Sequence, residues 1–205
     1  MTELTIWSET KKGGKVPENF DTTTTTINLG DKRIFKTDLD PLKEFNDLEV
    51  LILSGNEIEQ IDLTPVGSCT SLVEFSLGGN NIGQIDLSPL AACTNLQHLD
   101  LSYNKLTDID ITPLEHCTEL KTLHLFDNKL ETIQIASLKK NKKLRNLTLT
   151  NNAFETVDIS YLFFLSNLVK LGLDPEVKLV ATKKAKGWKN VPVPLQPLLD
   201  GIEWV

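Results

Sequence analysis

Apolar residues recur along this chain with a period of 24 positions. Leu51 and Leu53 alternate with Val50, Ile52 and Ser54, and a period of two is typical of a strand with one face turned inward. The same short segment returns in every period. The sequence therefore predicts strands centred on residues 27–29, 51–53, 75–77, 99–101, 123–125, 147–149 and 171–173.

A single unit of this size cannot bury its own leucines, so the units are expected to stack. Their strands would form one parallel sheet with a spacing of roughly 4.8 Å and a shared apolar interior. An asparagine stands where each strand turns away, at Asn56, Asn80, Asn104, Asn128 and Asn152. Its side chain can bond backbone groups of neighbouring coils, so we interpret this column as a structural ladder.

The outer arm of each unit carries a helix-start signal. Thr64-Pro65 and its equivalents at 88–89 and 112–113 predict a hydroxyl N-cap followed by proline in the first turn. Leu90 and Cys93 are three residues apart and are expected to face inward. The fifth unit lacks the cap and the proline, and residues 139–143 are polar. We therefore expect a short or irregular arm there.

The repeated pattern Leu48-x-x-Leu51-x-Leu53-x-x-Asn56-x-Ile58 resembles that of the leucine-rich repeat family. The finer motif, residues 85–90 followed by residues 93–96, resembles that of uncharacterised prokaryotic, notably archaeal, repeat proteins. The resemblance implies an α/β fold: a right-handed solenoid shaped as a short horseshoe. Its parallel sheet would line the concave face, with short helices or 3-10 turns on the convex face.

The chain is expected to be a single domain with two capping segments, because the end units of a solenoid expose apolar faces. Residues 1–23 are interpreted as an N-terminal cap, a hairpin turning at residues 12–14. About seven repeats fill residues 24–181, and residues 182–205, with two tryptophans, form a C-terminal cap. Alternatively, the proline-rich stretch 191–194 is an extended peptide that docks on another protein.

Composition narrows the class of protein. The net charge is −7 and the isoelectric point is near 5.0, which argues against nucleic-acid binding by general charge attraction. No apolar run reaches the roughly 18 residues of a membrane span, and residues 1–10 show no signal-peptide pattern. The three cysteines favour a reducing compartment. We therefore expect a cytoplasmic protein.

Two further columns have structural interpretations. Cys69, Cys93 and Cys117 share one register with Phe45 and Leu165, so we expect buried free thiols rather than a disulfide. Aspartates recur at residues 38, 62, 86, 110 and 158 and are interpreted as solvated acids, a calcium ladder being the alternative. The basic residues between 139 and 145 are interpreted as a solvated face or, alternatively, a contact for an acidic partner.

The sequence contains none of the common catalytic signatures. We find no glycine-rich phosphate loop, no G-x-S-x-G, no C-x-x-C and no H-E-x-x-H. We therefore predict no catalytic residues, no resident metal and no cofactor.

The candidate site is the concave face of the third and fourth units counted from Leu48, with strands at residues 99–101 and 123–125. Gln97, His98, Asp100, Ser102 and Tyr103 are expected to point outward from one, and their equivalents in the next include His124, Phe126 and Asp127. The 24-residue register would place Asp100 beside His124 and Tyr103 beside Asp127. Aromatic anchors with polar neighbours are typical of protein-binding hot spots. The predicted protein-binding residues are His98, Asp100, Tyr103, His124, Phe126 and Asp127, with Glu74 and Arg145 as rim charges.

These observations favour a non-enzymatic protein-interaction module, expected to be a monomer. The partner would be a protein, and neither nucleic acid nor membrane is expected to bind. Two alternatives stay open. One is a structural or self-assembling scaffold piece, and the other is a metal-binding or enzymatic protein that uses His98, Asp100 and His124.

Overall fold

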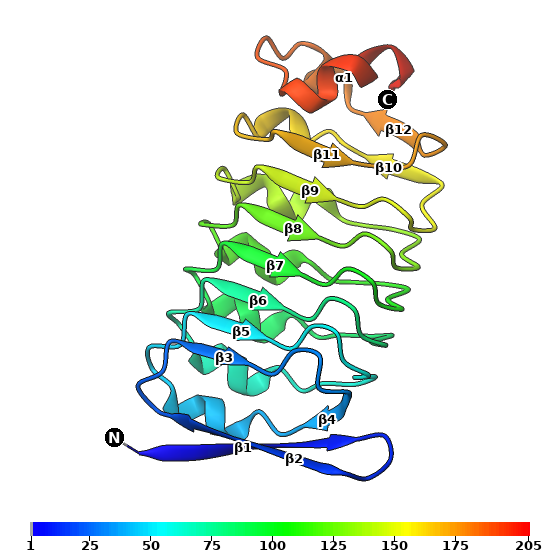
Figure 1. Ribbon diagram of the computed structural model, residues 1–205. Helices are drawn as coiled ribbons and strands as arrows, with labels where there is room; N and C mark the ends of the chain where they lie inside the picture. The colour runs from blue at the N-terminus through cyan, green and yellow to red at the C-terminus, as the bar shows by residue number, and fades with distance from the viewer. Residues whose placement is uncertain (1) are drawn as a thin grey trace.

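The computed structural model describes residues 2–205. Figure 1 shows a stack of coils that rises from the N-terminal hairpin to the C-terminal segment, with one strand of each coil on the same side. These strands form a seven-stranded sheet in the order β11-β9-β8-β7-β6-β5-β3. Their bounds are β3 (Thr26–Asn28), β5 (Val50–Ile52), β6 (Glu74–Ser76), β7 (His98–Asp100), β8 (Thr122–His124), β9 (Asn146–Thr148) and β11 (Lys170–Gly172).

The strand prediction is confirmed, with each strand beginning one residue earlier than expected. Every neighbouring pair is parallel and in a register of 24, so Leu51 lies beside Phe75, and Leu99 beside Leu123. The residues of this inward column are buried in every coil from β3 to β9. Because each unit presents its leucines at the same depth, the coils share one continuous apolar core.

The convex arm of the coils is built of 3-10 helices. They are η1 (Asp40–Glu44), η2 (Thr64–Ser68), η3 (Ser88–Ala92), η4 (Thr112–His116), η5 (Ile135–Lys140) and η6 (Leu162–Phe164). Leu90 and Cys93 face inward from this arm, as predicted, and both are fully buried.

The predicted N-caps are wrong by one residue. Leu63 occupies the N-cap of η2, and Thr64 is the first helical residue. Leu63 is drawn inward by the core, so the capping acceptor moves back to Asp62, whose Oδ1 accepts the Thr64 N–H at 2.8 Å. Bonds from the Thr64 hydroxyl and N–H lower the pKa of Asp62. The aspartate column is thus exposed, as expected, and also closes the turns before η1 to η4 and η6.

The fifth arm, expected to be short or irregular, is not short, but its N-cap Gln134, with ψ of 75°, differs from the N-caps of η2 to η4, where ψ is near 0°. Helix η5 has six residues, one more than η2, η3 or η4. Its apolar anchors Ile135 and Leu138 are still buried. Asn141 follows them in the cysteine column, fully buried, and its Nδ2 donates to the carbonyls of Leu114 at 2.9 Å and Cys117 at 2.7 Å. Inward anchoring therefore forms this helix without the proline.

The three cysteines are free and buried, as predicted. Each thiol faces a carbonyl oxygen of the preceding coil, with Sγ–O distances of 3.8, 3.5 and 3.3 Å for Cys69, Cys93 and Cys117. Burial raises the pKa of these thiols to about 11, about 12 and about 11, respectively. They are protonated core residues.

The asparagine ladder is confirmed as a structural feature. The Oδ1 of Asn104 accepts the N–H of Ile82 at 3.0 Å, and its Nδ2 donates to the carbonyls of Leu77 at 3.0 Å and Leu101 at 3.2 Å. Asn56 and Asn80 make the same bonds one coil apart. Each amide thus satisfies buried backbone groups of its own coil and of the preceding one.

The two ends of the solenoid are covered by different structures. At the N-terminus, β1 (Glu3–Thr10) and β2 (Lys15–Asp21) form an antiparallel hairpin, and β1 also pairs with β4 (Ile34–Thr37). Ile6 of this hairpin is fully buried. This packing supports the proposed N-terminal cap.

At the C-terminus a second parallel sheet forms from β10 (Thr156–Asp158), β12 (Lys178–Ala181) and β13 (Glu203–Trp204). Helices α1 (Lys183–Lys186) and η7 (Val193–Gly201) lie between β12 and β13. Leu195 and Ile202 are buried, and the ring of Trp204 lies 5.8 Å from that of Phe163. These contacts favour a cap over a free peptide. Within residues 2–205 no helix has both the length and the apolar character to cross a membrane.

Candidate protein-binding surface

A hollow of about 280 Å³ opens on the concave face, the side of the seven-stranded sheet opposite the core. Its polar lining comes from the outward positions of β6, β7 and β8 and consists of Glu74, Ser76, His98, Asp100, Thr122 and His124. Because outward residues alternate with buried ones, these strands bring two imidazoles and two carboxylates onto one surface. We call this set of six residues the central hollow.

Asp100 and His124 lie opposite each other in the register, as predicted. Burial lowers the pKa of His124, an effect that Asp100 opposes and that Lys170 and His98 reinforce. His124 is therefore neutral at pH 7. In that state it offers one hydrogen-bond donor and one acceptor.

The carboxylate of Asp100 is held in place by its own loop. Its Oδ1 accepts bonds from the Ser102 N–H at 2.9 Å and from the Ser102 hydroxyl at 2.6 Å. A Cβ atom at Gly78 would lie 2.9 Å from Oδ2, so glycine leaves the space for this carboxylate. Ser102 lies on the same side as Asp100, as its bond to that carboxylate requires, but it is only 2% exposed and so is not open to solvent as expected.

The loops that follow β7 and β8 carry an aromatic pair. The rings of Tyr103 and Phe126 lie 5.0 Å apart, edge to face, and His124 lies 5.8 Å from Phe126. Tyr103 is 58% exposed. Phe126 is half-buried rather than pointing freely into solvent as predicted, because Tyr103 and His124 cover it. The pair continues the central hollow towards the strand ends.

Tyr103 adopts a left-handed backbone conformation, with φ of +52°. The same turn recurs every 24 residues, and its other members are Asp31, Gly55, Gly79, Asp127 and Asn151, all with positive φ. Glycine, asparagine and aspartate tolerate this conformation, whereas a bulky side chain there is an outlier. The column of small and polar residues at this spacing is the sequence signal for this turn.

Asp127 lies one coil beyond Tyr103 in this column, as predicted. Its Oδ1 accepts the Asn151 Nδ2 at 3.1 Å, and the N–H of Asn151 donates to Asp174 Oδ2 at 2.8 Å. The carboxylate beside the aromatic pair is therefore oriented by the next coil.

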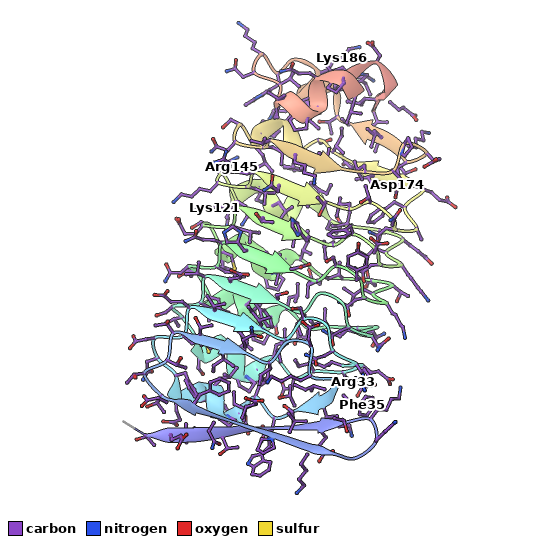
Figure 2. All side chains as sticks on the ribbon, in the orientation of Figure 1. Arg33, Phe35, Lys121, Arg145, Asp174 and Lys186 are labelled. Carbon is purple, nitrogen blue, oxygen red and sulfur yellow. The ribbon has the colours of Figure 1, made fainter. Side chains whose placement is uncertain are left out.

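The structure separates Arg145 from the other predicted residues. Glu74 lies in the central hollow, but Arg145 lines a different hollow of about 530 Å³ with Lys121, Lys143, Val169 and Val193. Figure 2 shows Lys121 and Arg145 together on the side where the strands begin, with Asp174 on the opposite side. Arg145 precedes β9 and therefore points along the edge of the sheet rather than over its face.

No three His, Cys, Asp or Glu side chains of residues 2–205 are arranged to hold a metal ion. This includes His98, Asp100 and His124, the set considered from the sequence. The metal-binding alternative has no support in this geometry.

Comparisons with known proteins agree with this architecture. The family model described as "Leucine Rich repeats (2 copies)" matches residues 94–140, and that described as "Leucine Rich repeat" matches residues 68–91. The matched repeats and the stacked coils are those of a leucine-rich repeat protein. Proteins of this family typically bind other proteins, and their fold is usually non-catalytic.

Two solved structures illustrate the likeness. An internalin from Listeria monocytogenes is 27% identical with a TM-score of 0.53, over 70% of this chain and 44% of its own. A leucine-rich repeat protein from Leptospira interrogans is 20% identical with a TM-score of 0.65, over 81% of this chain and 45% of its own. The chain thus matches less than half of either protein, and the second likeness shows the fold alone. A comparison with curated proteins found no match.

Proposed function

We propose that this protein is a non-catalytic protein-binding module whose partner docks on the central hollow and the adjoining pair Tyr103 and Phe126. The observation that carries this proposal is the backbone of Tyr103. A left-handed conformation costs a non-glycine residue roughly 1–2 kcal/mol, and local strain of this kind concentrates at functional sites. The neighbouring coils use glycine, aspartate and asparagine at this position, so the tyrosine has no structural reason to be there.

The chemistry of the surface indicates what it would bind. The exposed ring of Tyr103 and the half-buried ring of Phe126 offer an apolar platform, and aromatic residues of this kind act as interface anchors. Glu74 and Asp100 offer hydrogen-bond acceptors in the hollow beside it. We therefore expect a partner segment that places an apolar side chain on the aromatic pair and a basic or amide group in the hollow.

The alternative functions have less support. An enzyme would need a nucleophile or a metal beside His98 and His124, and the hollow supplies only the hydroxyls of Ser76 and Thr122, neither with a recorded bond to an imidazole. A purely structural scaffold would not need the strained tyrosine. We keep the cytoplasm as the proposed location, because three buried reduced thiols suit a reducing compartment.

The test is affinity capture with the intact protein and two variants. Tyr103→Asn removes the ring while keeping a residue that tolerates the left-handed turn, and Phe126→Ala removes the second ring. The loss of a hot-spot side chain weakens binding by about 2 kcal/mol, roughly 30-fold. Each variant should therefore lose the partner while its unfolding midpoint stays close to that of the wild type.

Tyr161→Ala is the matched control, because Tyr161 is also an exposed tyrosine, at 40%, but lies beside η6 away from the concave face. It should capture the partner with unchanged affinity. The proposal fails if Tyr103→Asn and Phe126→Ala bind the same partner as tightly as the wild type, or if Tyr161→Ala loses it equally.

A further inference from the structure

The charge of this protein is divided along the solenoid. Residues 1–120 contain 8 lysines and arginines against 20 acidic residues, whereas residues 121–205 contain 13 against 8. The N-terminal part is therefore strongly acidic and the C-terminal part is basic, although the whole chain is acidic. Such a division can orient one molecule against another.

The same division of charge appears along the side of the sheet where the strands begin, at one residue in each coil. The residues that immediately precede the strands are joined from coil to coil by backbone hydrogen bonds of 2.7–2.8 Å, in which each N–H donates to the carbonyl of the equivalent residue one coil before. These residues are Thr25, Glu49, Val73, Gln97, Lys121, Arg145 and Val169. We call this series the start edge. Its charges change from negative at Glu49 to positive at Lys121 and Arg145, which Figure 2 shows on the side where the strands begin.

The charges at the two ends of the start edge are available to a partner. Among the ion pairs within residues 2–205, none involves Asp47, Glu49 or Arg145. All three residues are exposed. A guanidinium of this kind can hold a carboxylate through two parallel bonds.

The midpoint of the start edge is Gln97, which precedes β7, the central strand of the seven. A two-fold axis through this point would place Glu49 of one molecule against Arg145 of a second. Asp47 would approach Lys143, which is already paired with Glu119 of its own molecule, so the Glu49–Arg145 contacts carry the arrangement. The two uncharged Gln97 residues would meet at the axis. A side-by-side arrangement with the coils running the same way would instead bring like charges together, so the charges select the antiparallel arrangement.

The shapes at the two ends of the start edge also correspond. Asn46 and Asp47 form an exposed turn before β5. Lys143 and Arg145 line the hollow of about 530 Å³, together with Val169 and Val193, which are 59% and 70% exposed. In the two-fold arrangement the acidic turn of each molecule faces the basic hollow of the other.

We propose that the start edge is a self-association surface, and that its partner is a second copy of this chain in antiparallel orientation. The proposal departs from the monomer expected from the sequence and does not rest on the proposed function. The contact uses the edge of the sheet, so both concave faces stay open, and a dimer would present two binding surfaces to a multivalent partner.

Sedimentation equilibrium at low and high salt tests this association. Exposed ion pairs are weak and are screened as the Debye length falls from about 30 Å at 0.01 M salt to about 3 Å at 1 M. The wild type should therefore form dimers at low salt and dissociate at high salt. A monomer at every protein and salt concentration would overturn the proposal.

Charge-reversal variants at Glu49 and Arg145 test whether the partner is a second copy of this chain. Glu49→Lys and Arg145→Glu each create two like-charge contacts in a symmetric dimer, so each variant alone should associate at least about tenfold more weakly. An equal mixture of the two variants should restore association as a heterodimer, visible by native mass spectrometry. The chain with both substitutions should again form homodimers.

The matched controls are Glu131→Lys and Lys129→Glu, which make the same charge changes at exposed positions after the strands rather than before them. They should leave the association constant within about twofold of the wild-type value. The proposal is wrong if the single variants associate like the wild type. It is also wrong if the mixture fails to restore association, since the basic end would then attract acidic molecules in general rather than this chain.

Discussion

Replacing Asn104 by alanine tests the interior ladder most directly. This side chain is 8% exposed, and its Oδ1 accepts the buried N–H of Ile82, which has no other bond within residues 2–205. Its Nδ2 donates to the carbonyls of Leu77 and Leu101, but the Leu77 carbonyl also accepts from Asn80 and the Leu101 carbonyl from Asn128. Its fourth contact, at 3.1 Å, is with the carbonyl of Ser102. That carbonyl also accepts the Gly79 N–H, so all three carbonyls would keep a partner and only the Ile82 N–H would lose its own.

A buried polar group left without a partner costs about 1–3 kcal/mol. The Ile82 N–H is one such group, and each of the three carbonyls loses one of its two donors. We therefore expect Asn104→Ala to lower the free energy of unfolding by about 2 kcal/mol. With a urea m-value of about 2–3 kcal/mol/M, the unfolding midpoint should fall by about 0.8 M.

Asn152→Ala provides the matched comparison. Asn152 makes equivalent bonds to Leu130, Leu125 and Leu149, but it is only half-buried. Water can replace more of its bonds, so we expect a smaller loss, about 1 kcal/mol. Equilibrium urea unfolding of both variants, followed by far-UV circular dichroism, measures the difference. A midpoint for Asn104→Ala equal to that of the wild type would refute the reasoning.

The remaining predictions concern the buried thiols and the C-terminal segment. Because burial raises the pKa of Cys93 to about 12 while an unfolded cysteine ionises near pH 8.5, the stabilising effect of the buried thiol is complete below about pH 8.5 and is lost as the pH rises towards 12. The fall in midpoint between pH 8 and pH 10 should therefore be smaller for Cys93→Ala than for the wild type, and equal falls would contradict this. Native protein should react slowly with a thiol reagent and denatured protein should show three free thiols; fast reaction of the native protein would contradict the burial. Deleting residues 188–205 removes buried Leu195 and Ile202, each contributing roughly 1.5–3 kcal/mol, so the shortened chain should be destabilised or aggregate; an equally stable monomer would show that the segment is no cap.

Several features of this protein could be determined from the sequence alone. In a solenoid each coil contacts mainly the coils before and after it, so a period of 24 residues sets the register of the whole sheet. The strands, the buried cysteines and the asparagine ladder all follow from this period. Even the opposition of Asp100 and His124 is a matter of adding 24 to a residue number.

The tertiary structure decided what the period could not show. A repeat indicates which residues are equivalent, but not the direction in which each points around the coil. Leu63 is buried in the core, so the capping acceptor of η2 is Asp62 rather than Thr64. The fifth helix forms without a proline, and the buried side chain of Asn141 bonds the preceding coil. Ser102 bonds Asp100 and is buried, and Tyr103 with His124 covers part of Phe126.

The direction of each side chain around its coil also explains why only some of the predicted site residues lie together. Glu74, His98, Asp100 and His124 lie together because outward positions of adjacent parallel strands are neighbours. Arg145 lies one residue before its strand, where the chain turns into the sheet, so it faces along the edge and belongs to another surface. Burial and direction at such positions depend on side chains from several coils at once, and only the packed structure brings those side chains together.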